Sequence, residues 1–174
     1  MVRLCLCIFI LLDVMFSEQA NNQAITSPVL KRNNRRNYLS FNDKTYFFGT
    51  IFKANYFSAL QFCRQQGMHL VSITSHDENE RIGHFIKDIG AQDKQFWTSG
   101  TNFIEEYQFV WMSTGNYLVY TNWDVGQPSL KNSAGVTENC IDVGFHEAGF
   151  TWNDADCGLK LYFICEAYEN CPQK

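Results

Sequence analysis

The cysteines constrain the fold of this chain more than any other feature, because disulfides between them fix which segments lie together. How many cysteines the mature protein keeps depends on where it begins. The chain has 174 residues and seven cysteines. Cys5 and Cys7 lie in an apolar run from Leu4 to Leu12 that follows Arg3, a pattern typical of a secretory signal peptide. This run is shorter than the ~20 apolar residues of a membrane span. We therefore predict a signal peptide over residues 1–20, a secreted protein and no stable membrane insertion.

Removal of the signal peptide leaves five cysteines. In an oxidising compartment, five cysteines indicate two disulfides and one spare thiol. Zinc fits poorly, because the chain has no Cys-x-x-Cys pair. The spare cysteine is expected to be Cys171, which can link two chains into a homodimer, remain free or bond a small thiol. The five are Cys63, Cys140, Cys157, Cys165 and Cys171.

The composition describes one globular domain. Hydrophobic residues make up 45% of the chain, and the 16% share of aromatic residues favours half-buried strands over a helical bundle. The net charge of −4 lacks the basic excess of a nucleic-acid-binding domain, so we expect no nucleic-acid partner. Residues 21–37 are polar and Asn-rich, which predicts a flexible polar and basic arm. The ordered domain then spans residues 38–168, and residues 169–174 form a tail.

Capping residues and apolar periodicity predict two helices. The first begins at Asn55 and runs to about Gln66. The second begins at a capping box formed by Ser75 and Glu78 and runs to Gly90. Their expected apolar faces are Phe57, Leu60 and Cys63 in the first helix, and Ile82, Phe85, Ile86 and Ile89 in the second.

Short runs of β-forming residues surround these helices. Gly49 is expected to end the first run, and long polar loops separate the later ones. Two helices with many short strands indicate an α+β domain, with the helices set against an antiparallel sheet. The predicted strands are 44–48, 68–73, 96–100, 109–111, 141–143 and 162–165.

The last third of the chain carries a cluster of oxygen donors. It contains Gln127-Pro128-Ser129, Glu138-Asn139-Cys140 and Trp152-Asn153-Asp154-Ala155-Asp156-Cys157. Amide, carboxylate and hydroxyl oxygens are the ligands that Ca²⁺ prefers, and it takes about six to eight of them. No Ser or Cys nucleophile lies in a recognisable catalytic motif. The pattern therefore predicts a calcium-dependent binding surface and not an enzyme. Trp123 and Trp152 are interpreted as packing residues.

These motifs resemble the C-type lectin-like domain family, and particularly its insect-type secreted members. Further matching stretches are Ala59-Leu60-x-Phe62-Cys63, Phe96-Trp97-Thr98-Ser99-Gly100 and Tyr162-x-Ile164-Cys165-Glu166. The resemblance covers residues 38–166. It implies an α+β C-type lectin fold, in which two helices pack on short antiparallel sheets with long calcium-binding loops. It also implies the disulfides Cys63–Cys165 and Cys140–Cys157.

The resemblance further implies one Ca²⁺ site that also binds carbohydrate. The usual tripeptides of the family are Glu-Pro-Asn, associated with mannose, and Gln-Pro-Asp, associated with galactose. This chain has Gln-Pro-Ser, which leans toward galactose but replaces one carboxylate with a hydroxyl and so predicts weaker Ca²⁺ binding. The implied metal and sugar ligands are Gln127, Ser129, Glu138, Asn153 and Asp154, with a cis peptide bond before Pro128.

Two functions follow for such a chain. The first is a secreted, calcium-dependent lectin that binds microbial or host glycans in immune recognition or adhesion. The alternative is a calcium-independent protein-interaction module of the same fold that has lost sugar binding, because fold does not fix function.

Overall fold

The structure is a computed structural model that describes residues 35–168. The predicted signal peptide (1–20), most of the predicted arm (21–37) and the tail (169–174) with Cys171 lie outside the described residues. Arg35–Asn37 form a 3-10 helix ahead of the first strand. Across residues 35–168, each helix is too short or too polar to cross a lipid bilayer.

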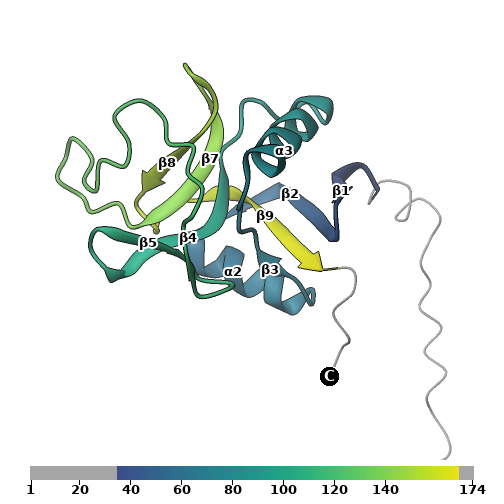
Figure 1. The fold of residues 1–174 in the computed structure, drawn as a ribbon, viewed down its shortest axis with the longest axis horizontal. Coiled ribbons are helices and arrows are strands. Elements are labelled where there is room, and N and C mark those ends of the chain that lie inside the picture. The colour runs from purple at the N-terminus through teal and green to yellow at the C-terminus, as the bar shows by residue number, and fades with distance from the viewer. Residues whose placement is uncertain (1–34, 169–174) are drawn as a thin grey trace, which may run out of the picture.

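The described chain folds into two α-helices and nine strands (Figure 1). The helices are α2 (Tyr56–Gln65) and α3 (His76–Asp88). The strands are β1 (Tyr38–Phe41), β2 (Lys44–Ala54), β3 (His69–Leu70), β4 (Phe96–Glu105), β5 (Gln108–Trp111), β6 (Asn116–Tyr117), β7 (Cys140–His146), β8 (Gly149–Ala155) and β9 (Leu161–Tyr168). The predicted α+β class is confirmed. The sheet is mixed, because β4 pairs with β9 in parallel while the other strand pairs are antiparallel.

The antiparallel pair β2–β9 lies between the two helices (Figure 1). Successive side chains of a strand point to opposite faces, and β9 uses both. Ile164 packs in the same core cluster as Ile86 of α3. Phe163 and Cys165 pack in the other cluster with Cys63 of α2. One strand therefore supplies both halves of the core, which explains its almost unbroken apolar sequence.

Strand β2 continues through Gly49 to Ala54, so the prediction that Gly49 ends the strand is wrong. Gly49 lies opposite Phe163 of β9. A Cβ atom at this position would lie 2.5 Å from the Phe163 ring. The glycine therefore makes room for a packed aromatic ring from a distant strand, a role that glycine also has in strands.

Helix α2 begins where predicted, because the Asn55 side chain accepts a hydrogen bond from the backbone N–H of Ser58 at 2.9 Å. Of its predicted apolar face, Cys63 is buried and Leu60 packs against the core, whereas Phe57 lies outside the buried face. Phe57 is 58% exposed and stacks on Phe103 of β4. Both faces have helical spacing, so only the tertiary contacts select one. The buried residues of α2 are Tyr56, Ala59 and Cys63.

Helix α3 also begins where predicted, with the Ser75 hydroxyl accepting the N–H of Glu78 at 3.2 Å. Its buried residues include Ile82 and Ile86, as the apolar periodicity predicts. Of the predicted strand 68–73, only His69–Leu70 pairs as β3, with β9.

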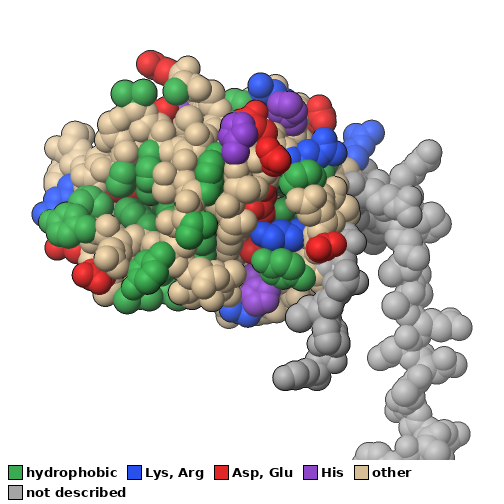
Figure 2. Space-filling view, viewed as in Figure 1, with side chains coloured by type: hydrophobic (Ala, Val, Ile, Leu, Met, Phe, Trp, Pro, Cys, Tyr) green, Lys and Arg blue, Asp and Glu red, His purple; other side chains and the backbone are tan. Residues whose placement is uncertain are grey.

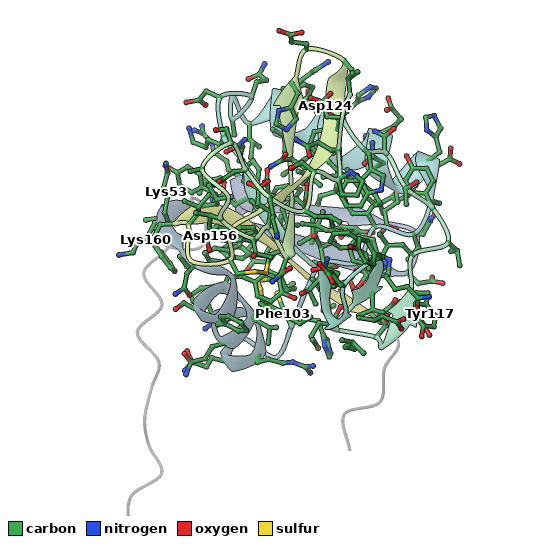
Figure 3. The ribbon with its side chains drawn as sticks, turned by 90° about the vertical axis from the view of Figure 1, so that its left-hand side faces the viewer. Lys53, Phe103, Tyr117, Asp124, Asp156 and Lys160 are labelled. Atoms are coloured by element: carbon green, nitrogen blue, oxygen red, sulfur yellow. A yellow bond between two sulfur atoms is a disulfide. The ribbon has the colours of Figure 1, made fainter. Side chains whose placement is uncertain are left out.

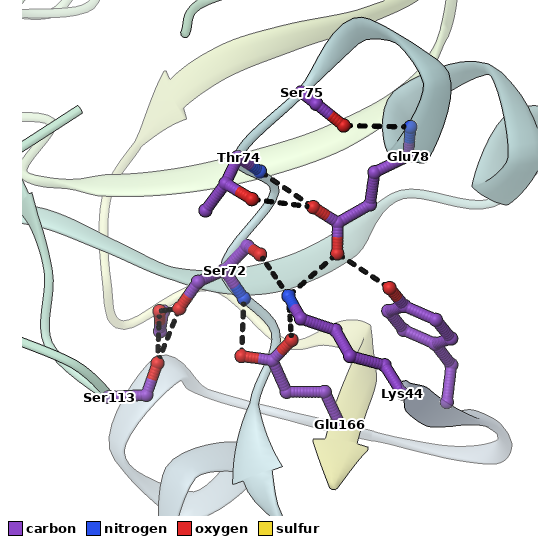
Figure 4. Close-up of polar contacts among 9 residues, drawn as sticks. Lys44, Ser72, Thr74, Ser75, Glu78, Ser113 and Glu166 are labelled. Carbon is purple, nitrogen blue, oxygen red and sulfur yellow. Dashed lines mark hydrogen bonds and ion pairs between the residues drawn. The ribbon is translucent and has the colours of Figure 1, made fainter. Parts of the chain in front are cut away.

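The Glu78 side chain joins a buried ionic cluster (Figure 4). The Lys44 ammonium lies 2.8 Å from Glu78 Oε1, 2.8 Å from Glu166 Oε2 and 3.2 Å from the Ser72 carbonyl oxygen. Burial alone lowers the pKa of Lys44, but the Glu166 and Glu78 carboxylates outweigh it and raise the pKa above its usual value. Lys44 therefore stays charged and joins β2, α3 and β9 inside the domain.

Two disulfides close the fold, with the pairing that the family resemblance implies. Cys63–Cys165 joins α2 to β9, with Cα atoms 5.5 Å apart. Cys140–Cys157 joins β7 to the residues after β8, with Cα atoms 5.3 Å apart. The second bridge lies beside the loop that carries the oxygen donors.

We expect Lys44→Met to lower the free energy of unfolding at neutral pH by about 3–5 kcal/mol, because it leaves two carboxylates buried without a cation. Denaturant unfolding measures the change. Lys160→Met, at an exposed position, is the matched control and should change stability by no more than about 0.5 kcal/mol. Equal stabilities of the two variants would show that the buried cluster contributes little.

Candidate functional site

The predicted ligands lie on a long irregular segment between β6 and β7 and on strand β8. Residues 118–139 form this segment, and its first part is hydrogen-bonded along β8. The Trp152 N–H donates to the Asn122 carbonyl at 2.8 Å, and the Asp124 N–H donates to the Trp152 carbonyl at 2.8 Å. Strand β8, which is absent from the strands predicted from the sequence, therefore holds the first part of the loop in place.

Trp152 fixes β8 in the core. It is fully buried, and its indole N–H donates to Asn79 Oδ1 of α3 at 2.7 Å. Its ring packs edge-on against Trp111, Tyr120 and Trp123. Trp152 is thus a packing residue, as predicted, and it aligns the two residues that follow it.

The Asp154 carboxylate holds the predicted binding loop. Its Oδ1 accepts the N–H of Ser129 at 2.8 Å, and its Oδ2 accepts the N–H of Leu130 at 2.7 Å. Leu130 has a left-handed backbone with φ of 62°, which is unfavourable for a branched side chain. Its carbonyl also accepts the Glu138 N–H at 2.9 Å. These bonds fix the residues that follow the cis Gln127–Pro128 peptide bond.

Three of the five predicted ligands are directly joined. The Ser129 hydroxyl donates to Glu138 Oε2 at 2.7 Å, and Ser129 also binds Asp154 through its backbone. Asn153 is joined instead to Asp142 of β7, because its Nδ2 donates to Asp142 Oδ2 at 3.0 Å. Gln127 Oε1 is buried and accepts no hydrogen bond from the described residues.

Asp142 is the residue that sequence reasoning missed. It is fully buried between Ile141 and Val143, and one of its oxygens has no partner within residues 35–168. Burial raises the pKa of Asp142 to about 7; the hydrogen bond from Asn153 opposes the shift, and the charges of Glu138 and Asp154 add to it. A polar residue at the centre of an apolar strand is the signal that could have identified it.

The predicted ligands supply oxygen atoms, which are the ligand type that Ca²⁺ prefers. The charges of Glu138 and Asp154 act on the Asp142 carboxylate, and within residues 35–168 none of these three carboxylates takes part in an ion pair. The same part of the chain has no group of three His, Cys, Asp or Glu side chains arranged to hold a metal. An ion at this loop would therefore depend on neutral oxygens such as the unpartnered Gln127 Oε1.

Comparison with known proteins points to one family. The sequence pattern of the C-type lectin domain family matches residues 52–167. The C-type lectin mosGCTL-7 of Aedes aegypti is 30% identical over 133 residues, which cover 73% of this chain and 86% of that protein. Versican core protein of Rattus norvegicus is 40% identical over 107 residues, which cover 60% of this chain but only 3% of versican.

The fold has solved counterparts as well. The carbohydrate-recognition domain of the mouse scavenger receptor C-type lectin superposes with a TM-score of 0.66 at 31% identity. The superposition covers 76% of this chain and 96% of that domain. The described residues thus correspond to nearly the whole of an independently solved domain.

We expect Asp154→Asn to loosen the loop in the absence of calcium, because an amide offers one acceptor oxygen where two backbone donors need two. Hydrogen exchange measured by NMR in chelator should show the Ser129 and Leu130 amides exchanging about tenfold faster. Asp156→Asn is the control, since its carboxylate caps Gly158 and contacts neither amide. Unchanged protection in Asp154→Asn would contradict the proposed clamp.

We also expect Asp142 to make stability fall with rising pH. Its pKa is about 7 in the folded state against 3.8 ordinarily, so between these values the folded state binds a proton that the unfolded state lacks. Asp142→Asn, whose side-chain oxygen still accepts from Asn153, removes this loss. The difference in unfolding free energy between variant and wild type, measured in chelator, should grow by about 3 kcal/mol from pH 5 to pH 8, because the folded and unfolded states differ by one proton over about two pH units of this range. A constant difference would contradict the assignment.

Proposed function

Because this chain belongs to the C-type lectin domain family, we propose that residues 127–138 and strand β8 form a calcium-dependent glycan-binding site. The family consists of non-enzymatic, carbohydrate-binding modules, and the chain is a lectin-like module of this kind. Calcium dependence, the sugar preference and secretion are the parts that we propose.

The acidic cluster is the observation that carries the proposal. The charges of Glu138 and Asp154 act unfavourably on the buried Asp142 carboxylate, and Gln127 Oε1 is buried without a donor within residues 35–168. A buried acceptor costs free energy unless a hydrogen-bond donor or a cation binds it. A divalent cation at the loop would offset both costs.

Each proposed ligand has a separate role. Asp154 positions the loop through two backbone amides and retains lone pairs for an ion. The Ser129 hydroxyl donates its hydrogen to Glu138 Oε2, so the lone pairs of the Ser129 oxygen remain free to accept. Asn153 is oriented by Asp142, which fixes the direction of its amide. A bound Ca²⁺ would coordinate two neighbouring sugar hydroxyls, while the same amide and carboxylate groups hydrogen-bond those hydroxyls.

We propose a leaning toward galactose, supported by Gln127 in the position of the galactose-type tripeptide. Ser129 contributes a neutral hydroxyl where that tripeptide has a carboxylate, so we expect weak Ca²⁺ affinity. The partners would be microbial or host glycans in recognition or adhesion. The two disulfides are consistent with an oxidising, extracellular location, and we propose that the protein is secreted.

Calcium titration by calorimetry tests the function. We expect wild type to bind Ca²⁺ and to gain thermal stability from it, and Glu138→Ala to lose both effects. Ser129→Asp should tighten Ca²⁺ binding by roughly tenfold or more, since it adds a third carboxylate to the ligand set. Ser133→Asp, on the same loop but outside the ligand set, is the matched control.

A glycan array with and without chelator then identifies the ligand class. Chelator-sensitive binding that Glu138→Ala abolishes is the expected result. If wild type ignores millimolar Ca²⁺, the alternative of a calcium-independent interaction module replaces this proposal.

A further inference from the structure

An open groove lies directly beside the proposed glycan site. It has a volume of about 530 Å³, and Pro128, the middle residue of the Gln-Pro-Ser tripeptide, forms part of its wall. The opposite wall comes from the β4–β5 turn and from β6, through Tyr107 and Tyr117. Volumes of about 300–1,000 Å³ are typical of small-molecule sites. The groove is thus continuous with the loop that carries the proposed ligands.

The groove presents aromatic faces on a fixed base. Phe109 and Trp123 line it with ring centroids 5.1 Å apart, and both are half-buried against the core. Tyr107 and Tyr117 remain 74% and 61% exposed, and Figure 3 shows Tyr117 at the outer edge of the domain. Exposed tyrosines gathered around one groove are typical of a binding surface, because each offers an apolar ring and a polar tip.

The chemistry of the groove fits a sugar ring. A pyranose has one face of C–H groups, which stacks on an aromatic ring, and an edge of hydroxyl groups, which need hydrogen-bond partners. Gln108 and Thr121 line the groove and supply such partners. Within residues 35–168, no charged residue lines the groove. The carboxylates next to its lining residues along the chain, Glu106 beside Tyr107 and Asp124 beside Trp123, disfavour an anionic ligand. In the space-filling view, most charged side chains gather on the α3 side, and a few lie at the opposite edge beside hydrophobic side chains (Figure 2).

We propose that this groove is a second sugar subsite, which binds the penultimate residue of a neutral oligosaccharide whose terminal residue occupies the calcium loop. The proposal rests on the proposed function, because Pro128 links the two positions. The protein would then recognise at least a disaccharide. Tyr107 and Tyr117 provide the rings on which the penultimate sugar stacks. The terminal sugar, held at the calcium loop, orients the oligosaccharide toward the groove.

Calorimetric titration of matched sugars tests the subsite. Lactose is compared with methyl β-galactoside, and mannobiose with methyl α-mannoside, all with saturating CaCl₂. We expect wild type to bind the disaccharide of the preferred pair about 2- to 10-fold more tightly, the range that aromatic contacts provide. The Tyr107→Ala/Tyr117→Ala double variant should lose this advantage while its affinities for Ca²⁺ and for the monosaccharide stay unchanged.

Tyr168→Ala is the matched control, since this exposed tyrosine lies at the end of β9 and does not line the groove. If the double variant keeps the disaccharide advantage, the subsite is wrong and the calcium site stands. If the double variant loses both sugars but keeps Ca²⁺, the tyrosines belong to the primary site and the separate subsite is also wrong. If wild type binds no glycan on the array, the proposed function fails and the subsite fails with it.

Discussion

One buried carboxylate organises the binding loop of this domain. Both oxygens of Asp154 accept backbone N–H groups, from Ser129 and Leu130. Leu130 itself has a left-handed backbone, which the second hydrogen bond stabilises. Hydrogen bonds to an ionised acceptor are among the stronger ones in proteins. They allow a segment of more than twenty residues without regular structure to keep one shape. Asp154 keeps its own position because Trp152, two residues earlier, is locked into the core.

The domain contains two clusters of carboxylates, which differ in whether a cation from the chain itself neutralises them. Glu78 and Glu166 both form ion pairs with the Lys44 ammonium. The charges of that cluster are therefore compensated within the domain, and the cluster stabilises the fold. Glu138, Asp142 and Asp154 have no such partner within residues 35–168. A buried carboxylate without a cation is costly, and this cost falls on Asp142, which is fully buried. The contrast supports a site that is completed by a cation from solution.

The proposed glycan site and the aromatic groove depend on the same support. Trp123 packs against Trp152 and also lines the groove, while Pro128 borders the groove and the ligand loop. A change in β8 would therefore disturb both positions together. This coupling explains why the loop, the groove and β8 are best regarded as one surface that is built on one strand.

Much of this organisation is encoded locally. The sequence determined both helix starts, since Asn55 and Ser75 cap the helices that follow them. It also determined the α+β class and the motifs that carry the family resemblance, and with them the pairing of the cysteines. The face of α2, the course of β2 beyond Gly49 and the strand β8 needed the tertiary structure, because each depends on which distant ring or strand lies opposite. Asp142 and the groove beside Pro128 were decided in the same way: local pattern specifies how a segment folds, whereas burial and neighbours exist only once strands far apart in the chain have come together.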